Sequence, residues 1–346
     1  MSRDAVEVSA APMTARVVHA SLRAVPWWRA AALMVFAAVL PALPLRAQGG
    51  ALFLLVPFGA RAVAVGEAVS ADTSLGTEGI WWNAAALARL AKKELAFQHS
   101  QTLLANSEML TFAVPSRMIG TLALSAYMVD YGDQQATDIN NSFTGVISNR
   151  NYLVSATYAT PIGKRAGLGV TYKWIAQRFN GCSGYCGDNP PVSGSTSALD
   201  IGAQFVVPIK FPLNAGISVR NLGPKLQTKD QPQADELPQT IQAGVMSRLP
   251  IQALTAGGAS LDLSADVVKA NALIGTNLSL GAALGYRDQY FLRVGYKKQT
   301  GEGSGPSIGL GFQRGAFGFD FARRFDAVSS RSEEGPPTYV MLRARF

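Results

Sequence analysis

The chain has 346 residues, of which 48% are hydrophobic and only 16% are charged, and it contains 34 glycines. This abundance of apolar residues excludes a disordered chain, and no heptad pattern persists that would indicate a coiled coil. The formal net charge is +8, but the lysines and arginines are scattered along the sequence, which argues against a nucleic-acid-binding surface.

Residues 1–47 have the layout of a secretory signal peptide. Three arginines precede an apolar run from Ala30 to Leu45, and the polar stretch RAQGG follows it. A membrane anchor is the alternative, but Pro41 and Pro44 cut the run short of the roughly 20 residues that a spanning helix needs. We expect cleavage near Ala47. The remaining chain has no second apolar run of this kind, so it is either soluble outside the cytoplasm or a β-barrel.

Residues 48–93 form a second region with a different pattern. Its stretch NAAALARLAKK consists of good helix formers, with Asn83 placed as the N-cap and Lys92 and Lys93 at the C-terminal end. We therefore expect a helix in this region, ahead of the strand-rich part of the chain.

Residues 94–346 show apolar side chains at every second position, which is the pattern of strands with two different faces. For example, Val170 and Tyr172 alternate with Thr171 and Lys173. Such segments are about 10 residues long, the length that a tilted strand needs to cross a bilayer. We count fourteen, which begin near Glu94, Ser107, Met118, Arg150, Arg165, Ser195, Phe211, Leu237, Leu254, Thr276, Gln289, Gly305, Ala316 and Pro337.

The linkers between these segments alternate in length. Tight turns such as PSRM and YRDQ alternate along the chain with linkers that are mostly longer and rich in Gly, Asn, Asp and Pro. Outer-membrane barrels alternate short periplasmic turns with long external loops, whereas a soluble β-sandwich gives no reason for such sorting. We predict an all-β transmembrane fold, an antiparallel outer-membrane β-barrel of about 14 strands over residues 94–346. The partly helical residues 48–93 would form an N-terminal plug segment.

Two stretches resemble the PorV/PorQ family, whose members are relatives of the FadL-type outer-membrane transporters. The first, GARAVAVGEAVSADTSLGTEGIWWNAAALA, matches the opening signature of the family at Gly59, Arg61, Gly66, Trp82 and Asn83. It departs from that signature at Thr73, Ala84 and Ala86. The second is GISVRNLGPKL, followed by ELPQTIQAGV. The resemblance implies a 14-stranded barrel with the N-terminal segment within or beneath its lumen.

The resemblance also implies a function. It favours a scaffold or shuttle in protein secretion or surface attachment of the type IX kind, with a secreted cargo protein as partner. The barrel itself fits FadL-like transport of a hydrophobic or amphipathic small molecule equally well. In either case we expect the bacterial outer membrane as the location, with outer-membrane lipid and the barrel-assembly machinery as partners and no nucleic acid.

The residues needed for catalysis are scarce. After residue 47 the chain keeps one histidine, His99, while zinc sites and most acid–base schemes need well-placed imidazoles. His99 and Ser100 are adjacent, and adjacent strand residues point to opposite faces, so they cannot pair as base and nucleophile. We predict no enzyme, no cofactor and no metal site.

Cys182 and Cys186 lie in the long linker after the fifth predicted strand. In an exported chain, two cysteines this close favour a disulfide over free thiols. Metal binding is the alternative, but two sulfurs without a nearby histidine supply too few ligands.

Five cations occupy strand positions predicted to face the barrel interior, and Asp320 opposes them. They are Lys173, Arg293, Lys297, Arg343 and Arg345. They form either an ordinary solvated interior or a basic path that attracts anionic amphiphiles or an acidic partner segment.

The last predicted strand, TYVMLRARF, would place Leu342 and Phe346 toward lipid. Its terminal Phe346 resembles the sorting signal that the barrel-assembly machinery reads on outer-membrane proteins. We therefore expect Phe346 to act as the assembly signal.

Overall fold

The computed structural model describes residues 50–103, 105–137, 140–180, 192–228, 234–251, 258–271, 275–300, 303–326 and 335–346. These residues belong to one compact unit within residues 44–346. The predicted signal peptide lies outside the described residues, and so do Cys182 and Cys186 with their predicted disulfide. Within the described ranges, no helix combines the length and the apolar character needed to cross a bilayer.

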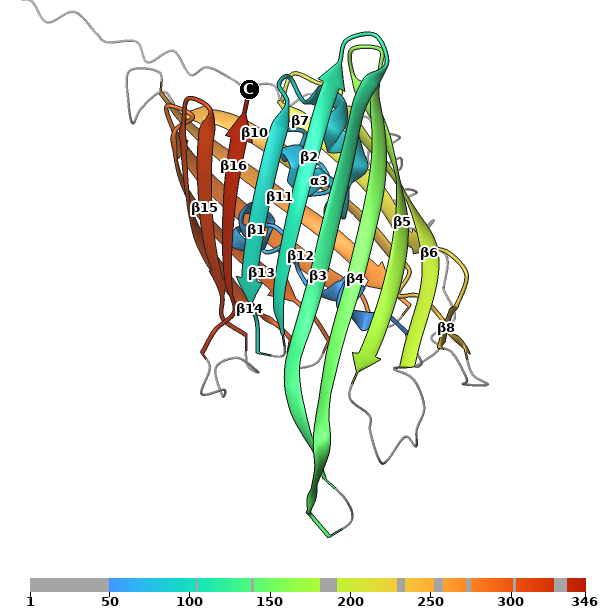
Figure 1. The fold of residues 1–346 in the computed structure, drawn as a ribbon. Coiled ribbons are helices and arrows are strands. Elements are labelled where there is room, and N and C mark those ends of the chain that lie inside the picture. Colours follow the sequence, from blue (N-terminus) through green and yellow to red (C-terminus); the bar gives the residue numbers. More distant parts are fainter. Residues whose placement is uncertain are drawn as a thin grey trace, which may run out of the picture. The chain divides into compact units, whose positions relative to one another are not determined.

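A single antiparallel sheet closes on itself as a barrel (Figure 1). Of its 16 described strands, fourteen form the barrel wall, and the other two, β8 (Leu226–Thr228) and β9 (Ala234–Asp235), make a small hairpin beside β6. The wall strands are β1 (Glu94–Gln101), β2 (Asn106–Ser116), β3 (Gly120–Thr137), β4 (Phe143–Ile162), β5 (Ala166–Asn180), β6 (Val192–Val206), β7 (Leu213–Leu222), β10 (Thr240–Ile251), β11 (Ala259–Ala270), β12 (Asn277–Tyr286), β13 (Tyr290–Lys298), β14 (Gly305–Arg314), β15 (Phe317–Arg324) and β16 (Thr338–Arg345). β1 and β16 pair from Glu94↔Arg345 to Gln101↔Thr338, so the predicted fourteen-stranded barrel is confirmed.

The largest boundary error is at the fourth strand, which was expected near Arg150 and begins at Phe143. β3 and β4 continue as a two-stranded ribbon beyond their other neighbours, because β2 pairs with β3 only up to Asp130 and β5 pairs with β4 only from Ser148. The ribbon projects from one end of the barrel in Figure 1. It has no buried face, so its sequence lacks the apolar alternation by which strands are recognised.

The two ends of the barrel differ in their connections. The short-turn end holds the turns after β2, β4, β12 and β14, together with the C-terminus (Figure 1). The long-loop end holds the β3–β4 ribbon and the connection from β7 to β10. In outer-membrane barrels the short turns are periplasmic and the long loops external.

The outward face of the wall is apolar. On β5, Leu168, Val170, Tyr172 and Trp174 are 42–50% exposed, whereas Lys173 between them is 3% exposed. A closed barrel also leaves no unpaired strand edge, so its backbone hydrogen bonds are satisfied inside a bilayer. The outer face is therefore suited to contact lipid.

Residues 50–93, called the plug from here on, lie inside the barrel as short helical elements (Figure 1). The elements are η1 (Leu52–Leu55), α2 (Ala60–Ala64), η2 (Gly76–Glu78), α3 (Gly79–Trp82) and η3 (Ala84–Arg89). α2 packs against β13 to β16, and η3 packs against β3 to β6 on another part of the wall. The plug thus spans the lumen.

The predicted helix forms as the 3₁₀ helix η3, which begins after Asn83 as expected but ends at Arg89. The sequence pattern predicted a helix that continues to Lys92 and Lys93, but η3 does not reach them. The reason is that Lys93 already pairs with Phe346: its N–H donates to the carbonyl of Phe346 at 3.1 Å, and the N–H of Phe346 donates to the carbonyl of Lys93 at 3.0 Å.

Glycines on the inward face of the wall let the plug backbone lie directly on it. A Cβ atom on Gly281 would stand 2.6 Å from the carbonyl oxygen of Val65, and one on Gly295 would stand 2.7 Å from Cα of Gly66. Gly66 itself has φ +65°, a conformation that glycine adopts at low cost. These contacts fix the plug against β12 and β13.

Candidate functional site

The plug is anchored by Asn83, one of the residues that carry the family resemblance. Its Oδ1 accepts a hydrogen bond from the N–H of Ala85 at 3.1 Å, which confirms its role as N-cap. Its side-chain amide donates to the carbonyl oxygens of Ser70 at 2.8 Å and Ala203 at 3.1 Å. Asn83 is fully buried, so it joins two parts of the plug to strand β6.

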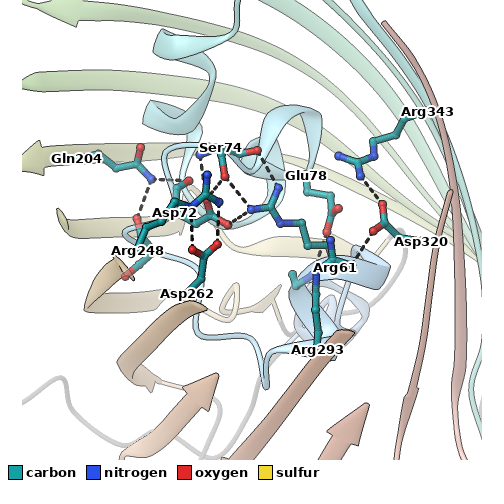
Figure 2. A network of polar contacts seen from close by, with 12 residues as sticks. Arg61, Asp72, Ser74, Glu78, Gln204, Arg248, Asp262, Arg293, Asp320 and Arg343 are labelled. Carbon is teal, nitrogen blue, oxygen red and sulfur yellow. Dashed lines mark hydrogen bonds and ion pairs between the residues drawn. The ribbon is translucent and has the colours of Figure 1, made fainter. Parts of the chain in front are cut away.

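Arg61 joins two parts of the plug to each other. Its guanidinium donates to the carboxylate of Asp72 at 2.5 Å and to the hydroxyl of Ser74 at 2.8 Å (Figure 2). Burial alone would raise the pKa of Asp72, but Arg61 and the hydrogen bonds from Ser74 hold that pKa below its usual value. Asp72 therefore stays charged and keeps the plug loop closed on itself.

The other three signature residues also have structural roles in the plug. The indole N–H of Trp82 donates to the carbonyl oxygen of Phe58 at 2.8 Å. Gly59 has φ +90° and leaves room for the side chain of Glu78, while Gly66 allows the contact with β13 described above. All five signature residues therefore build the plug.

The five predicted lumen cations all point inward, and each is paired with a carboxylate. The ion pairs join Lys173 to Asp200 (2.6 Å), Arg293 to Asp320 (2.7 Å), Arg343 to Asp320, Lys297 to Glu67 (2.5 Å) and Arg345 to Glu94 (2.5 Å). Arg293 and Arg343 share one carboxylate, that of Asp320 (Figure 2). The cations are thus held in separate ion-pair groups, and their role as a basic path remains a prediction.

Sequence reasoning identified one of these carboxylates, Asp320, and missed the others. Asp200 and Glu94 occupy inward positions of the strand alternation, so the same pattern could have identified them. Glu67 gives no such signal, because it lies in the plug and is brought to the wall only by the tertiary fold. It pairs with Arg324 (3.1 Å) as well as Lys297, and its own φ is +68°, which is uncommon for a residue with a side chain.

Cavities lie on both sides of the plug. One at the short-turn end has a volume of about 230 Å³, and charged side chains line much of it, including Arg61, Asp72, Arg248, Asp262, Arg293 and Arg343. The cavity at the long-loop end has a volume of about 110 Å³ and is lined by Leu54, Leu55, Trp81 and Trp82 together with Glu67, Lys297 and Arg324.

A short strap, Val65–Ala68, lies between the two cavities. Val65 and Ala68 line the cavity at the short-turn end, and Glu67 lines the cavity at the long-loop end. The strap is held by the ion pairs of Glu67 and by a hydrogen bond from the side-chain amide of Gln242 to the carbonyl oxygen of Glu67 at 3.0 Å. A path between the cavities would have to pass this strap.

His99 and Ser100 lie on opposite faces of β1, as predicted. His99 Nδ1 lies 3.0 Å from the carboxylate of Glu108 on the outer face. The hydroxyl of Ser100 is buried on the inner face, 2.6 Å from the hydroxyl of Ser107. The two side chains therefore do not form a base–nucleophile pair.

Phe346 lies on the outer face at the short-turn end, where its side chain is 61% exposed. Its ring stacks on Phe112 of β2 with a centroid distance of 6.4 Å. Its role as an assembly signal remains a prediction.

Comparison with known proteins identifies the fold. No protein-family model matches this chain, and no curated protein sequence does. Among solved structures, the chain is similar to the toluene transporter TbuX of Ralstonia pickettii, with a TM-score of 0.56 and 14% identity over 85% of this chain and 100% of that one. It is also similar to the Pseudomonas putida toluene transporter TodX (TM-score 0.54, 12% identity, 83% and 96% covered) and to the CymD monoaromatic hydrocarbon channel (0.52, 12%, 84% and 98%).

At these identities the likeness shows the fold alone, which is that of the outer-membrane barrels named above. The predicted barrel fold is thereby confirmed, and the resemblance to the PorV/PorQ family and its FadL-type relatives remains a prediction. With its closed wall and apolar outer face, the protein is an outer-membrane β-barrel.

Proposed function

We propose that this barrel passes small hydrophobic or amphipathic molecules across the outer membrane, without chemical change, and that the plug is its barrier. The observation that carries the proposal is the pair of cavities on either side of the plug, which are separated by the strap Val65–Ala68. The similar structures are named as toluene transporters and a monoaromatic hydrocarbon channel, which supports the same class of function.

The linings of the cavities suit amphipathic molecules. Leu55, Trp81 and Trp82 at the long-loop end offer apolar and aromatic surface, and Lys297 and Arg324 offer positive charge beside it. Both cations are engaged by Glu67, so an anionic group on a ligand would have to compete with that carboxylate. Such competition would release the strap from the wall. Lys297, one of the cations of the predicted basic path, would then bind the anionic group of the ligand.

Uptake of labelled toluene and labelled octanoate, in a Gram-negative host that lacks its own hydrocarbon-uptake barrel, tests the proposal. Leu55→Asp places a charge in the apolar lining and should lower toluene uptake about fivefold, because roughly 1 kcal/mol of apolar contact is lost. Leu52→Asp is the matched control, since Leu52 lies in the same 3₁₀ helix but is 54% exposed. Wild-type uptake no higher than that of the empty host would contradict the proposal.

The second candidate is a scaffold or shuttle for secreted proteins, supported by the PorV/PorQ resemblance at the plug signature. Purification of the full chain from membranes separates the two candidates by what accompanies the barrel. A protein that carries the C-terminal domain of type IX cargo would favour the scaffold, whereas a bound hydrophobic small molecule would favour transport.

A further inference from the structure

A row of polar side chains crosses the outer face of the wall at the long-loop end. The strand register places Asp130 of β3 opposite Arg150 of β4, Arg150 opposite Arg178 of β5, and Arg178 opposite Ser193 of β6. All four are at outward positions, because Lys173 on β5, an odd number of residues from Arg178, is buried in the interior.

The two arginines in this row face each other directly across an antiparallel strand pair. Like charges in such positions repel and destabilise the pair. In the structure each guanidinium is turned toward another neighbour. Arg150 donates to Asp130 at 2.9 Å, and Arg178 lies over the ring of Tyr152 at 5.7 Å from its centroid. Within the part of the chain that the structure describes, Arg178 has no carboxylate partner, so the row keeps an excess of positive charge.

The position of the row relative to the apolar band indicates its surroundings. Leu168 marks the short-turn end of the exposed apolar stripe on β5, which continues through Trp174. From Leu168 to Arg178 the strand rises about 33 Å along its own axis, or about 25 Å across the membrane at a tilt of about 40°. This is the height of the apolar band of an outer-membrane barrel. Arg178 and Arg150 therefore lie at the level of the lipid headgroups, at the end where external loops are found.

We propose that Arg150 and Arg178, with the hydroxyl of Ser193, bind a phosphate group of a glycolipid in the outer leaflet. A guanidinium presents paired N–H donors that match the oxygens of a phosphate, and a dianion between two arginines turns their repulsion into attraction. The apolar stripe that extends from the arginines toward the short-turn end, with Tyr172 and Trp174, receives the acyl chains of the same lipid. This site lies on the outer wall and is independent of any passage through the lumen.

Binding of lipid A to the purified full chain, measured by native mass spectrometry in detergent, tests this site. Arg150→Gln with Arg178→Gln should weaken binding of diphosphoryl lipid A about tenfold, since each surface arginine contributes to headgroup attraction. Lys164→Gln with Arg165→Gln is the matched control. It removes the same charge from the exposed β4–β5 turn at the opposite end of these strands, and it should leave binding unchanged.

Further arms separate a phosphate site from other causes. Lipid A without its phosphates should bind the wild type and the double variant equally, and inorganic phosphate at the same concentration should not displace the lipid. Wild-type affinity in the double variant, or displacement by inorganic phosphate, would overturn the assignment. Heat-modifiable migration verifies folding. If the double variant does not fold, Arg178→Gln alone decides the question. Arg178→Lys should bind lipid A with intermediate strength, because lysine keeps the positive charge but lacks the paired N–H donors of a guanidinium.

Discussion

At the scale of single residues, buried carboxylates hold the plug in place, and Glu78 differs from the rest. Its Oε2 accepts a hydrogen bond from the N–H of Ala62 at 3.1 Å, but its Oε1 has no partner among the described residues. Burial in the plug raises the pKa of Glu78 to about 7. Glu78 is therefore the plug residue whose charge changes close to neutral pH.

Glu78→Gln should remove a pH dependence of stability. The folded-state pKa of about 7 lies above the ordinary value of 4.5, so the folded protein binds a proton that the unfolded chain releases. That stabilisation is complete below about pH 4.5, and it is lost as the pH rises through about 7, with a magnitude on the order of 3 kcal/mol. Glutamine stays neutral and keeps the acceptor for Ala62.

Thermal unfolding of the purified protein between pH 5 and pH 8 measures this effect. The variant should be more stable than the wild type at pH 8, and the difference should shrink toward pH 5. Parallel pH profiles of the two proteins would show that Glu78 does not titrate in this range.

At the scale of elements, the fit between plug and wall depends on strands that lack side chains where the plug backbone arrives. Gly281 on β12 and Gly295 on β13 receive the strap residues Val65 and Gly66. Bulkier residues here would stand closer to the strap than van der Waals contact allows. The wall therefore specifies the position of the strap closely.

Gly295→Ala should loosen the plug. The added methyl group meets the backbone of Gly66, which cannot rotate away, and overpacking of this kind costs about 1–3 kcal/mol. Gly285→Ala is the control on β12, where the methyl group meets the side chains of Ser260 and Phe291, which can rotate. Susceptibility of cells to a small hydrophilic antibiotic should rise for Gly295→Ala and remain at the wild-type level for Gly285→Ala. Equal susceptibility of all three strains would indicate that the strap is not a barrier.

At the scale of the whole molecule, the wall and the plug have separate tasks. The wall closes through the β1–β16 pair and satisfies its own backbone, whereas the plug is joined to the wall mainly by side-chain hydrogen bonds and ion pairs. The wall should consequently fold without the plug.

Deletion of residues 51–91 should leave a folded barrel with an open, polar lumen. The inward ion pair Lys173–Asp200 and the cluster of Arg293 and Arg343 around Asp320 belong to the wall alone, so they remain. The purified variant should conduct ions steadily in a planar bilayer, while the full chain remains closed. A folded but non-conducting variant would mean that wall side chains fill the lumen by themselves.

Much of the fold was predictable because local sequence patterns determine it. The alternation on β5 and β13 specified both faces of the wall, and the position of Asn83 specified the start of η3. The β3–β4 ribbon was missed because neither of its faces is buried, and the early end of η3 was missed because Lys93 is recruited by the distant Phe346.

The sequence by itself determined that this protein is a barrel with an apolar outer face, since strand period and turn spacing are properties of neighbouring residues. Only the tertiary structure decided what the inward charges do. Glu67 lies 230 positions from Lys297 and 257 from Arg324. No local pattern encodes such pairs, because they arise from the closure of the sheet around the plug, which sets the distances between residues far apart in the chain.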